Sequence, residues 1–238
     1  MYGIPYHYYE KYRVRRYGFH GTSHFYVSRR AAEILGRPIE SLNIVTCHMG
    51  NGSSITAVKG GISVDTSMGF SPLPGIIMGT RSGDVDALLV SYLEEHEAID
   101  SKAMSHVLNK ESGLLGISGV SSDLRDIEEA ADAGNARAKL AEEMLCYGAK
   151  KYVGSYAAAM GGIDVLVFTA GIGENSGRTR EKICEGLEFM GIKIDKARNN
   201  VRAKEAIIST DDSRVTVMVV PTDEELVIAR DTKRIAIG

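Results

Sequence analysis

Long apolar runs are missing from the 238-residue sequence, and cysteine is scarce. The longest apolar stretches, such as residues 165–170, are far too short to span a bilayer. The N-terminal "MYGIPYHYYEKY" is aromatic and polar and lacks the apolar core of a signal peptide. The three cysteines, Cys47, Cys146 and Cys184, are scattered with no C-x-x-C spacing, which is typical of thiols in a reducing compartment. We therefore expect a cytoplasmic protein with no membrane segment.

An excess of positive charge is also absent. The chain has 28 basic and 31 acidic residues, for a net charge of −3, so it has no whole-surface affinity for nucleic acid and any anion site must be local. No G-x-x-x-x-G-K-[ST] occurs, which excludes a P-loop protein. The string "GIGENSG" approaches the dinucleotide fingerprint, but Ser176 stands where the third glycine belongs and the string lies late in the chain.

The pattern of apolar residues and turn residues predicts an α/β domain. Residues 22–36 read as a helix with Thr22 or Ser23 as N-cap, ended by Gly36. Three strand-like runs separated by glycine turns then form a meander over residues 43–66. Helical patterns cover residues 84–96, 101–110, 123–133 and 136–160.

Two strand–helix units complete the order of elements. Residues 164–171 form an apolar run typical of a strand buried on both faces, and one helix is expected to follow as far as residue 191. A second buried strand at 214–220 ends at Pro221, and a helix begins there with Thr222 as N-cap and Glu225 completing a capping box. We expect a mixed sheet flanked by helices, with chemistry in the loops at the strand ends.

Four glycine-containing loops at element boundaries are suited to binding an anion. They are "YGFHGTSH", which follows three arginines, "HMGNGSS", "MGTRSGD" and "AGIGENSG". Glycine allows close approach of backbone N–H groups, and a helix start favours phosphate. Each loop also has a plainer interpretation: the glycines can be ordinary turns, Arg81 a solvated arginine and His48 a core histidine. His20 and His24, four residues apart, can be metal ligands, although no third ligand lies nearby in the sequence.

Four strings are specific enough to indicate a family. They are "RRYGFHGTSH", "CHMGNGSSITAVKGGISVDTSMGFSPLPGIIMGTRSGD", "FTAGIGENS" and "VPTDEELVIARDT", and together they resemble the acetate kinases, with propionate kinase as a close relative. The resemblance covers essentially the whole chain. It implies an actin-like, ribonuclease-H-like ATPase domain, which is an α/β fold with a mixed sheet flanked by helices.

The resemblance also implies roles for particular residues. His20 looks like the histidine that contacts the transferring phosphoryl group, and Arg81 like the arginine that stabilises its charge. Glu224 resembles the glutamate linked to the metal, Mg²⁺ or Mn²⁺, although family members usually read Asn where this chain has Asp223. The residues expected to bind the nucleotide are Asn51 and Gly52 in the phosphate hairpin, Asp123 and Arg125 beside the adenosine, and Gly171, Ile172, Gly173 and Asn175 in the nucleotide loop.

The implied activity is reversible phosphoryl transfer between ATP and acetate, giving acetyl phosphate and ADP. Residues 1–20 are expected to be a junction between domains and residues 21–238 the C-terminal nucleotide-binding domain, with the family's N-terminal domain absent and little activity from this chain alone. A homodimer is implied, for which the helix at 136–160 is a candidate surface; its other interpretation is that it simply covers the sheet. Three alternatives remain: a propionate kinase, an inactive nucleotide-binding remnant or regulatory module, and a structural dimerisation domain.

Overall fold

The computed structural model describes residues 1–237, and the chain divides into two compact units, each described here by itself. The first, which we call the helical unit, comprises Met1–Phe19, Asn51–Ser54 and Ser67–Ala149. The second, which we call the sheet unit, comprises His20–Gly50, Ile55–Thr66 and the chain from Lys150 onward. Gly238, the predicted end of the C-terminal domain, lies outside the described residues.

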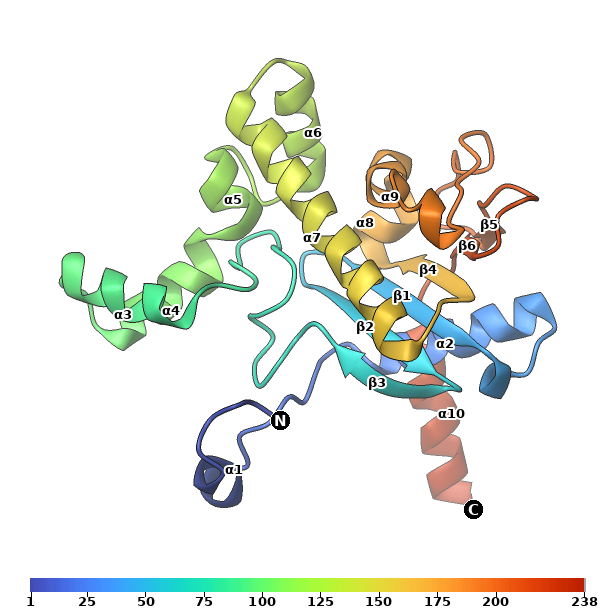
Figure 1. The fold of residues 1–238 in the computed structure, drawn as a ribbon, viewed down its shortest axis with the longest axis horizontal. Coiled ribbons are helices and arrows are strands. Elements are labelled where there is room, and N and C mark those ends of the chain that lie inside the picture. Colours follow the sequence, from blue (N-terminus) through green and yellow to red (C-terminus); the bar gives the residue numbers. More distant parts are fainter. Residues whose placement is uncertain (238) are drawn as a thin grey trace. The chain divides into compact units, whose positions relative to one another are not determined.

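A six-stranded mixed sheet, in the order β3-β2-β1-β4-β6-β5, forms the centre of the sheet unit (Figure 1). The pairs β1/β4 and β4/β6 are parallel, whereas β2/β3 and β5/β6 are antiparallel. The mixed sheet predicted from the sequence is therefore confirmed. The strand bounds are β1 Asn43–Met49, β2 Ser53–Lys59, β3 Ile62–Thr66, β4 Val165–Thr169, β5 Ala206–Ile207 and β6 Thr216–Val219.

The continuous apolar run predicted as a buried strand is β4, which lies between β1 and β6. Val165 pairs with Ile44 on one side and Thr216 on the other, and all five residues of β4 are buried. A parallel strand covered on both faces has no polar side, which is why its sequence does not alternate.

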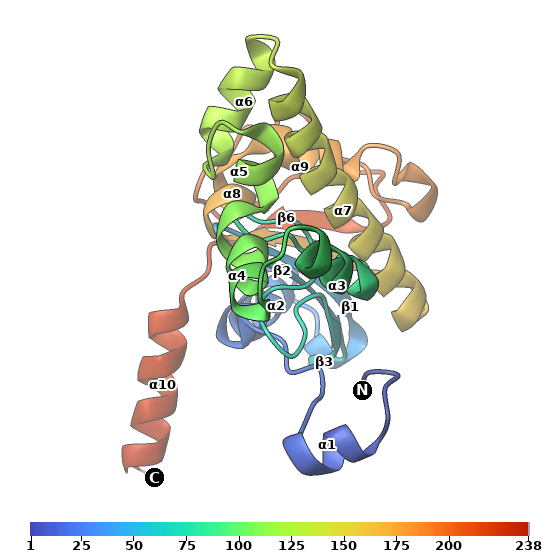
Figure 2. The ribbon, with the colours of Figure 1, turned by 90° about the vertical axis from the view of Figure 1, so that its left-hand side faces the viewer.

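Helices cover both faces of this sheet. Figure 2 shows α2 (Gly21–Leu35) on one side and α9 (Gly177–Cys184) on the other. Val27 and Ala31 of α2, one turn apart, are fully buried in a cluster that includes Val165 of β4. Gly36 ends α2 with a φ of 61°, as predicted.

The predicted N-caps of two helices are wrong. His20, not Thr22 or Ser23, occupies the N-cap of α2, in the left-handed conformation with a φ of 61°. The helix α10 (Glu224–Ile237) is capped by the carboxylate of Asp223, which accepts a hydrogen bond from Leu226 N at 2.9 Å. Asn and Asp are equally good N-caps, so the Asp223 that departs from the usual Asn of the family keeps this function.

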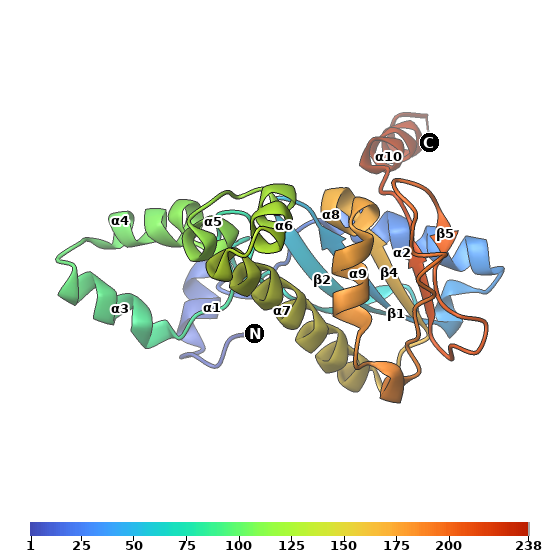
Figure 3. The ribbon, with the colours of Figure 1, turned by 90° about the horizontal axis from the view of Figure 1, so that it is seen from above.

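The single helix expected after β4 is also wrong, because two helices form. α8 (Ala170–Asn175) and α9 are separated at Ser176, whose hydroxyl caps α9 by accepting from Thr179 N at 3.1 Å (Figure 3). A serine side chain competes for backbone N–H groups and so favours a helix start over a helix interior. Residues Glu188–Met190 then form a 3₁₀ turn.

The helical unit contains the remaining helices. The sequence predicted those at 84–96, 123–133 and 136–160 to within a few residues but missed α1 and α5. It predicted one further helix, at 101–110. That segment is α4 (Ser101–His106) followed by a π-helical turn (Val107–Glu111). No helix among the described residues is long and apolar enough to cross a membrane. The other helices are α1 His7–Tyr12, α3 Ala87–His96, α5 Gly113–Ser118, α6 Leu124–Asp132 and α7 Ala136–Met160, of which residues up to Ala149 belong to this unit.

Candidate functional site

The predicted site residues divide between the two units. The sheet unit holds His20, Gly171, Ile172, Gly173, Asn175 and Glu224, and the helical unit holds Asn51, Gly52, Arg81, Asp123 and Arg125. Every one of them lies in a loop, in the first two residues of a helix or in the six-residue helix α8.

Three histidine rings gather where α2 begins and β1 ends. The ring of His20 stacks on that of His48, with centroids 4.0 Å apart and planes inclined by 14°. The ring of His24 lies 6.1 Å from His48 and meets it edge-on. His20 is placed by the left-handed turn that precedes α2, which directs the chain back over β1. His48, considered above as a core histidine, is buried but lies directly against the predicted catalytic residue.

Burial keeps two of these histidines neutral. Desolvation, with the neighbouring His20 adding to it, lowers the pKa of His48 to about 3. The pKa of His24 is lowered well below its usual value by burial and then by His48 and His20. At neutral pH both rings therefore act as uncharged hydrogen-bonding groups. Among the described residues no group of three or more His, Cys, Asp or Glu side chains can hold a metal ion, so the His20–His24 pair is not joined by a third ligand.

The nucleotide loop predicted at residues 171–175 is the short helix α8. Its first residue, Ala170, has a φ of 64°, and its N–H donates to Glu174 Oε1 at 2.8 Å. The same carboxylate oxygen accepts from Thr222 N at 3.2 Å, which ties the loop to the turn before Glu224. Asn175 Nδ2 donates to Gly171 O at 2.9 Å. Gly171 itself is exposed, with no atom within 4 Å of where a Cβ would lie, so its backbone stays open to a ligand.

Arg180 is a buried arginine that sequence reasoning missed. Its guanidinium donates to Gly173 O at 2.8 Å, to Asn199 Oδ1 at 2.8 Å and to two further carbonyls, those of Asn199 and Val201. The side chain is fully buried, and this burial lowers its pKa to about 10. It thereby anchors one carbonyl of the α8 loop to the segment around Asn199. The only signal in the sequence is its position on the inward face of α9, four residues before Cys184.

Arg81 in the helical unit is held in a tightly packed loop. Its Nη1 donates to Pro72 O at 3.2 Å and contacts the sulfur of Met78 at 3.6 Å, and its side chain is only partly exposed. Gly113, with a φ of 63°, packs against this loop: an added Cβ would collide with the carbonyl oxygens of Met78 and Arg81. The structure therefore disfavours a freely solvated Arg81.

Asn51 lies against the same loop. Gly79 N donates to Asn51 O at 3.3 Å, and a Cβ on Gly79 would collide with the Asn51 side chain and lie 3.0 Å from Ser122 O. The helical unit thus brings together the turn after β1, the loop that carries Arg81 and the residue before Asp123.

Asp123 and Arg125 form an ion pair at the start of α6. Asp123 Oδ1 accepts from Arg125 N at 2.9 Å, which makes Asp123 the N-cap of α6, and its two oxygens also accept from the guanidinium at 3.0 and 2.6 Å. These hydrogen bonds lower the pKa of Asp123 to about 2. The Arg125 side chain is 88% exposed, so it is accessible to a ligand.

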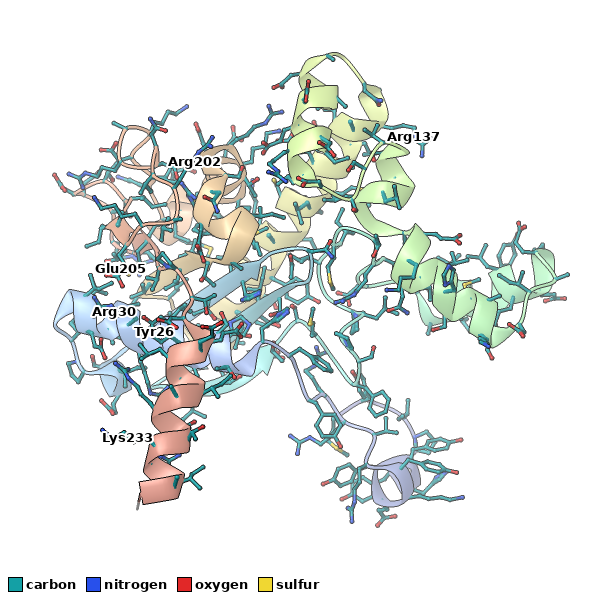
Figure 4. The ribbon with its side chains drawn as sticks, turned by 180° about the vertical axis from the view of Figure 1, so that it is seen from behind. Tyr26, Arg30, Arg137, Arg202, Glu205 and Lys233 are labelled. Atoms are coloured by element: carbon teal, nitrogen blue, oxygen red, sulfur yellow. The ribbon has the colours of Figure 1, made fainter. Side chains whose placement is uncertain are left out.

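A groove of about 510 Å³ runs along α2 and α10 in the sheet unit. Its wall includes Tyr26 and the ion pair of Arg30 with Glu205, whose closest atoms are 2.6 Å apart and which lie side by side in Figure 4. None of the predicted site residues is among the described residues that line it.

The strand order, the mixed sheet and the helices on both faces define an α/β domain of the actin-like ATPase class. The chain belongs to the acetokinase family, whose sequence profile matches residues 1–230.

Individual relatives agree with this assignment. The chain is 62% identical to the acetate kinase of Alkaliphilus metalliredigens over 233 residues, which cover 98% of this chain and 59% of that protein. The crystal structure of Porphyromonas gingivalis acetate kinase matches 99% of this chain with a TM-score of 0.97 and 56% identity, and a propionate kinase from Francisella tularensis matches 97% with a TM-score of 0.90 and 43% identity. These matches cover 59% and 58% of the two proteins, so the chain spans about three-fifths of the length of its relatives.

Proposed function

We propose that this chain is the C-terminal portion of an acetate kinase, which transfers a phosphoryl group reversibly between ATP and acetate to give acetyl phosphate and ADP. The observation that carries the proposal is a match to acetate kinases over 98–100% of this chain at 62–63% identity. The placement of the predicted site residues in loops, at helix starts and in the short helix α8 supports it further.

The proposed roles follow from the chemistry of phosphoryl transfer. The transition state spreads negative charge over the equatorial oxygens, so the protein mainly supplies positioning and positive potential. Arg81 is proposed to stabilise that charge, and His20 to donate a hydrogen bond to the transferring group. The nucleotide is proposed to bind through Asn51 and Gly52 at its phosphates, through Asp123 and Arg125 at its adenosine, and through the α8 loop with Gly171, Ile172, Gly173 and Asn175.

Glu224 is proposed as the protein's ligand to Mg²⁺ or Mn²⁺. It is the first residue of α10 and is partly buried, whereas the neighbouring Asp223 is committed to capping that helix. A single carboxylate suits Mg²⁺, which is commonly held by one or two carboxylates together with substrate phosphates and water. When bound, the ion would neutralise charge on the phosphates; Glu224 would hold it beside the turn that Glu174 ties to the α8 loop.

The experiment that tests the proposal compares two proteins. One is this chain; the other is this chain fused to the part of the Alkaliphilus metalliredigens relative that it does not cover. We expect the fusion to form acetyl phosphate from ATP and acetate in a hydroxamate assay, the chain alone to show little or none, and Arg81→Ala to lower the rate of the fusion by roughly 10³. A fusion that folds but does not transfer phosphate would refute the proposal, and full activity of the chain alone would refute the need for the remaining part.

A propionate kinase is the second candidate, supported by the Francisella tularensis structure at 43% identity. The ratio of kcat/KM for acetate and for propionate, measured on the fusion, distinguishes the two. An inactive nucleotide-binding remnant would bind ADP in calorimetry, with His20→Ala leaving its affinity nearly unchanged and turnover absent. A structural dimerisation domain would bind no nucleotide.

The Asp123 variant for these binding experiments needs care, because Asp123 also caps α6. Asp123→Asn keeps a good N-cap and removes only the charge, whereas Asp123→Ala also removes the cap and would destabilise α6 by about 1 kcal/mol. We expect Asp123→Asn to weaken ADP binding while leaving the melting temperature nearly unchanged.

A homodimer in the cytoplasm is also proposed. Several apolar side chains on α3 and α7 are exposed within the helical unit, including Leu88 at 76% and Tyr147 at 64%. Exposed apolar surface of this kind favours association. The three cysteines are buried and form no disulfide among the described residues, which suits a reducing compartment. Sedimentation equilibrium tests the dimer, and Leu88→Asp is expected to dissociate it.

A further inference from the structure

A buried serine joins two parts of the proposed site within the sheet unit. Ser23, in the first turn of α2, is fully buried. Its hydroxyl lies 2.8 Å from His48 Nδ1 on one side and accepts a hydrogen bond from Thr222 Oγ1, also at 2.8 Å, on the other. These three side chains come from α2, β1 and the turn before α10, so the link connects segments 25 and 199 residues apart.

The direction of this link assigns the position of a proton. A serine hydroxyl has one proton to donate. Because Thr222 donates to Ser23, His48 Nδ1 is the acceptor within reach of the buried Ser23 proton, and an unprotonated Nδ1 satisfies it. Since the buried His48 ring is neutral at pH 7, its proton lies on Nε2.

His24, the other buried histidine, supplies an internal comparison. Its Nδ1 lies 2.7 Å from Thr46 Oγ1, and Thr46 in turn donates its own proton to Thr56 O at 3.4 Å. Each of the two buried histidines, His24 on α2 and His48 on β1, therefore has a different hydroxyl group against its Nδ1.

We propose that Ser23 is a positioning residue, which holds His48 as the Nε2–H tautomer and ties it to the turn at Thr222. His48 is the platform on which the His20 ring stacks at 4.0 Å, and Thr222 lies two residues before Glu224. Ser23 therefore fixes His48, on which the His20 ring stacks, relative to the turn just before Glu224. The consequence for catalysis rests on the proposed function, whereas the tautomer does not.

The tautomers can be measured directly by two-bond ¹H–¹⁵N correlation spectra of the histidine side chains at pH 7, on the whole chain. We expect wild-type His48 to show a protonated Nε2 and an unprotonated Nδ1. Ser23→Ala should move the His48 ring nitrogens toward values averaged between tautomers and leave His24 unchanged. Thr46→Val, the matched control, should move His24 and leave His48 unchanged.

The wild-type spectrum decides the matter even if Ser23→Ala does not fold. A proton on Nδ1 of His48 would overturn the proposal, as would a His48 pattern that Ser23→Ala leaves intact. Thr222→Val is the second variant: it removes the donor to Ser23, frees the serine hydroxyl to rotate, and should shift the His48 pattern in the same direction by a smaller amount.

The catalytic consequence is measured on the fusion protein described above. Ser23→Ala should lower kcat by about tenfold with the KM for acetate nearly unchanged, because a small misplacement of aligned groups affects the chemical step. An equal loss from Ser23→Ala and Thr46→Val would indicate general loosening of the sheet unit and overturn the positioning role. If the His48 tautomer is as expected but the wild-type fusion is inactive, the proposed function fails and the Ser23 assignment stands.

Discussion

Replacing Arg180 with methionine removes a buried charge and keeps most of the side-chain volume. The guanidinium donates four hydrogen bonds, all to uncharged acceptors: the carbonyls of Gly173, Asn199 and Val201, and Asn199 Oδ1. Methionine is flexible and fills irregular space, so the variant isolates the loss of these hydrogen bonds from the opening of a cavity.

The size of the effect follows from which acceptors lose their donor. Asn199 O also accepts from Val201 N at 2.8 Å, and the Asn199 amide also donates to Gly177 O at 2.8 Å, so that residue keeps other partners. The buried Gly173 carbonyl loses a strong donor, which costs about 1–3 kcal/mol for a buried unsatisfied group, and the half-buried Val201 carbonyl loses another at a smaller cost. Removal of the desolvated charge offsets part of this, and we expect the free energy of unfolding to fall by about 2–4 kcal/mol. In a chain of this length that lowers Tm by roughly 5–15 °C.

Urea unfolding followed by far-UV circular dichroism measures the change, with hydrogen exchange of peptides within residues 170–203 to locate it. Arg198→Met is the matched control. Arg198 pairs with Asp211 at 2.7 Å, but its side chain is 42% exposed, so its removal should change the free energy of unfolding by less than about 1 kcal/mol. Equal effects of the two variants, or unchanged exchange around α8 in Arg180→Met, would refute the reasoning that burial makes Arg180 an anchor of the loop.

Three further predictions concern stability. Asp223→Ala should destabilise α10 by about 1 kcal/mol through loss of its cap, while Asp223→Asn changes the helix signal in circular dichroism little; a large effect of the Asn variant would contradict the capping role. Gly113→Ala should lower the free energy of unfolding by more than about 2 kcal/mol in thermal unfolding, because the added Cβ would collide with two carbonyl oxygens of the Arg81 loop. Its control, Gly134→Ala, has a φ of 93° but open space around the added Cβ, so it should lower the free energy of unfolding by only about 1 kcal/mol. His24 and His48 have lowered pKa values, so below pH 6.5 the unfolded state binds protons that the folded state does not. The free energy of unfolding should therefore fall as the pH drops below 6.5, by up to about 1.4 kcal/mol per pH unit for each histidine, and for His48 this fall should continue to about pH 3. A free energy of unfolding from urea denaturation that stays constant between pH 6.5 and 4.5, above the range of most carboxylates, would show that these rings are not held neutral.

Much of the secondary structure could be read from local patterns. The meander at 43–66, the buried strand β4 and the long helix α7 were correctly predicted because apolar periodicity and glycine turns act over a few residues. The helix ends were less accurate. Thr222 resembles an N-cap in every local respect, but its hydroxyl bonds to Ser23, 199 residues away, and Asp223 caps the helix in its place.

The candidate site likewise has some residues that local sequence patterns identify and others whose role depends on partners distant in the chain. Motif strings identified the residues at the loops, since glycine, histidine and arginine at element boundaries are recognisable without coordinates. His48 could equally be a core residue on sequence grounds, because nothing local distinguishes it; its stacking against His20 depends on how α2 crosses the end of β1. The one local signal for Arg180, its spacing of four residues from Cys184, did not predict burial, because an arginine on a short helix is more often exposed than buried.

The sequence by itself determined that this chain is an α/β protein of the acetokinase family with glycine-containing loops at the ends of its strands and helices, because composition, periodicity and short motifs are properties of neighbouring residues. Only the tertiary structure decided which hydroxyl caps a helix and which orients a histidine, and which arginine is buried. Those outcomes depend on partners distant in the chain, and a polar group takes its role from whichever partner the fold places within hydrogen-bonding distance.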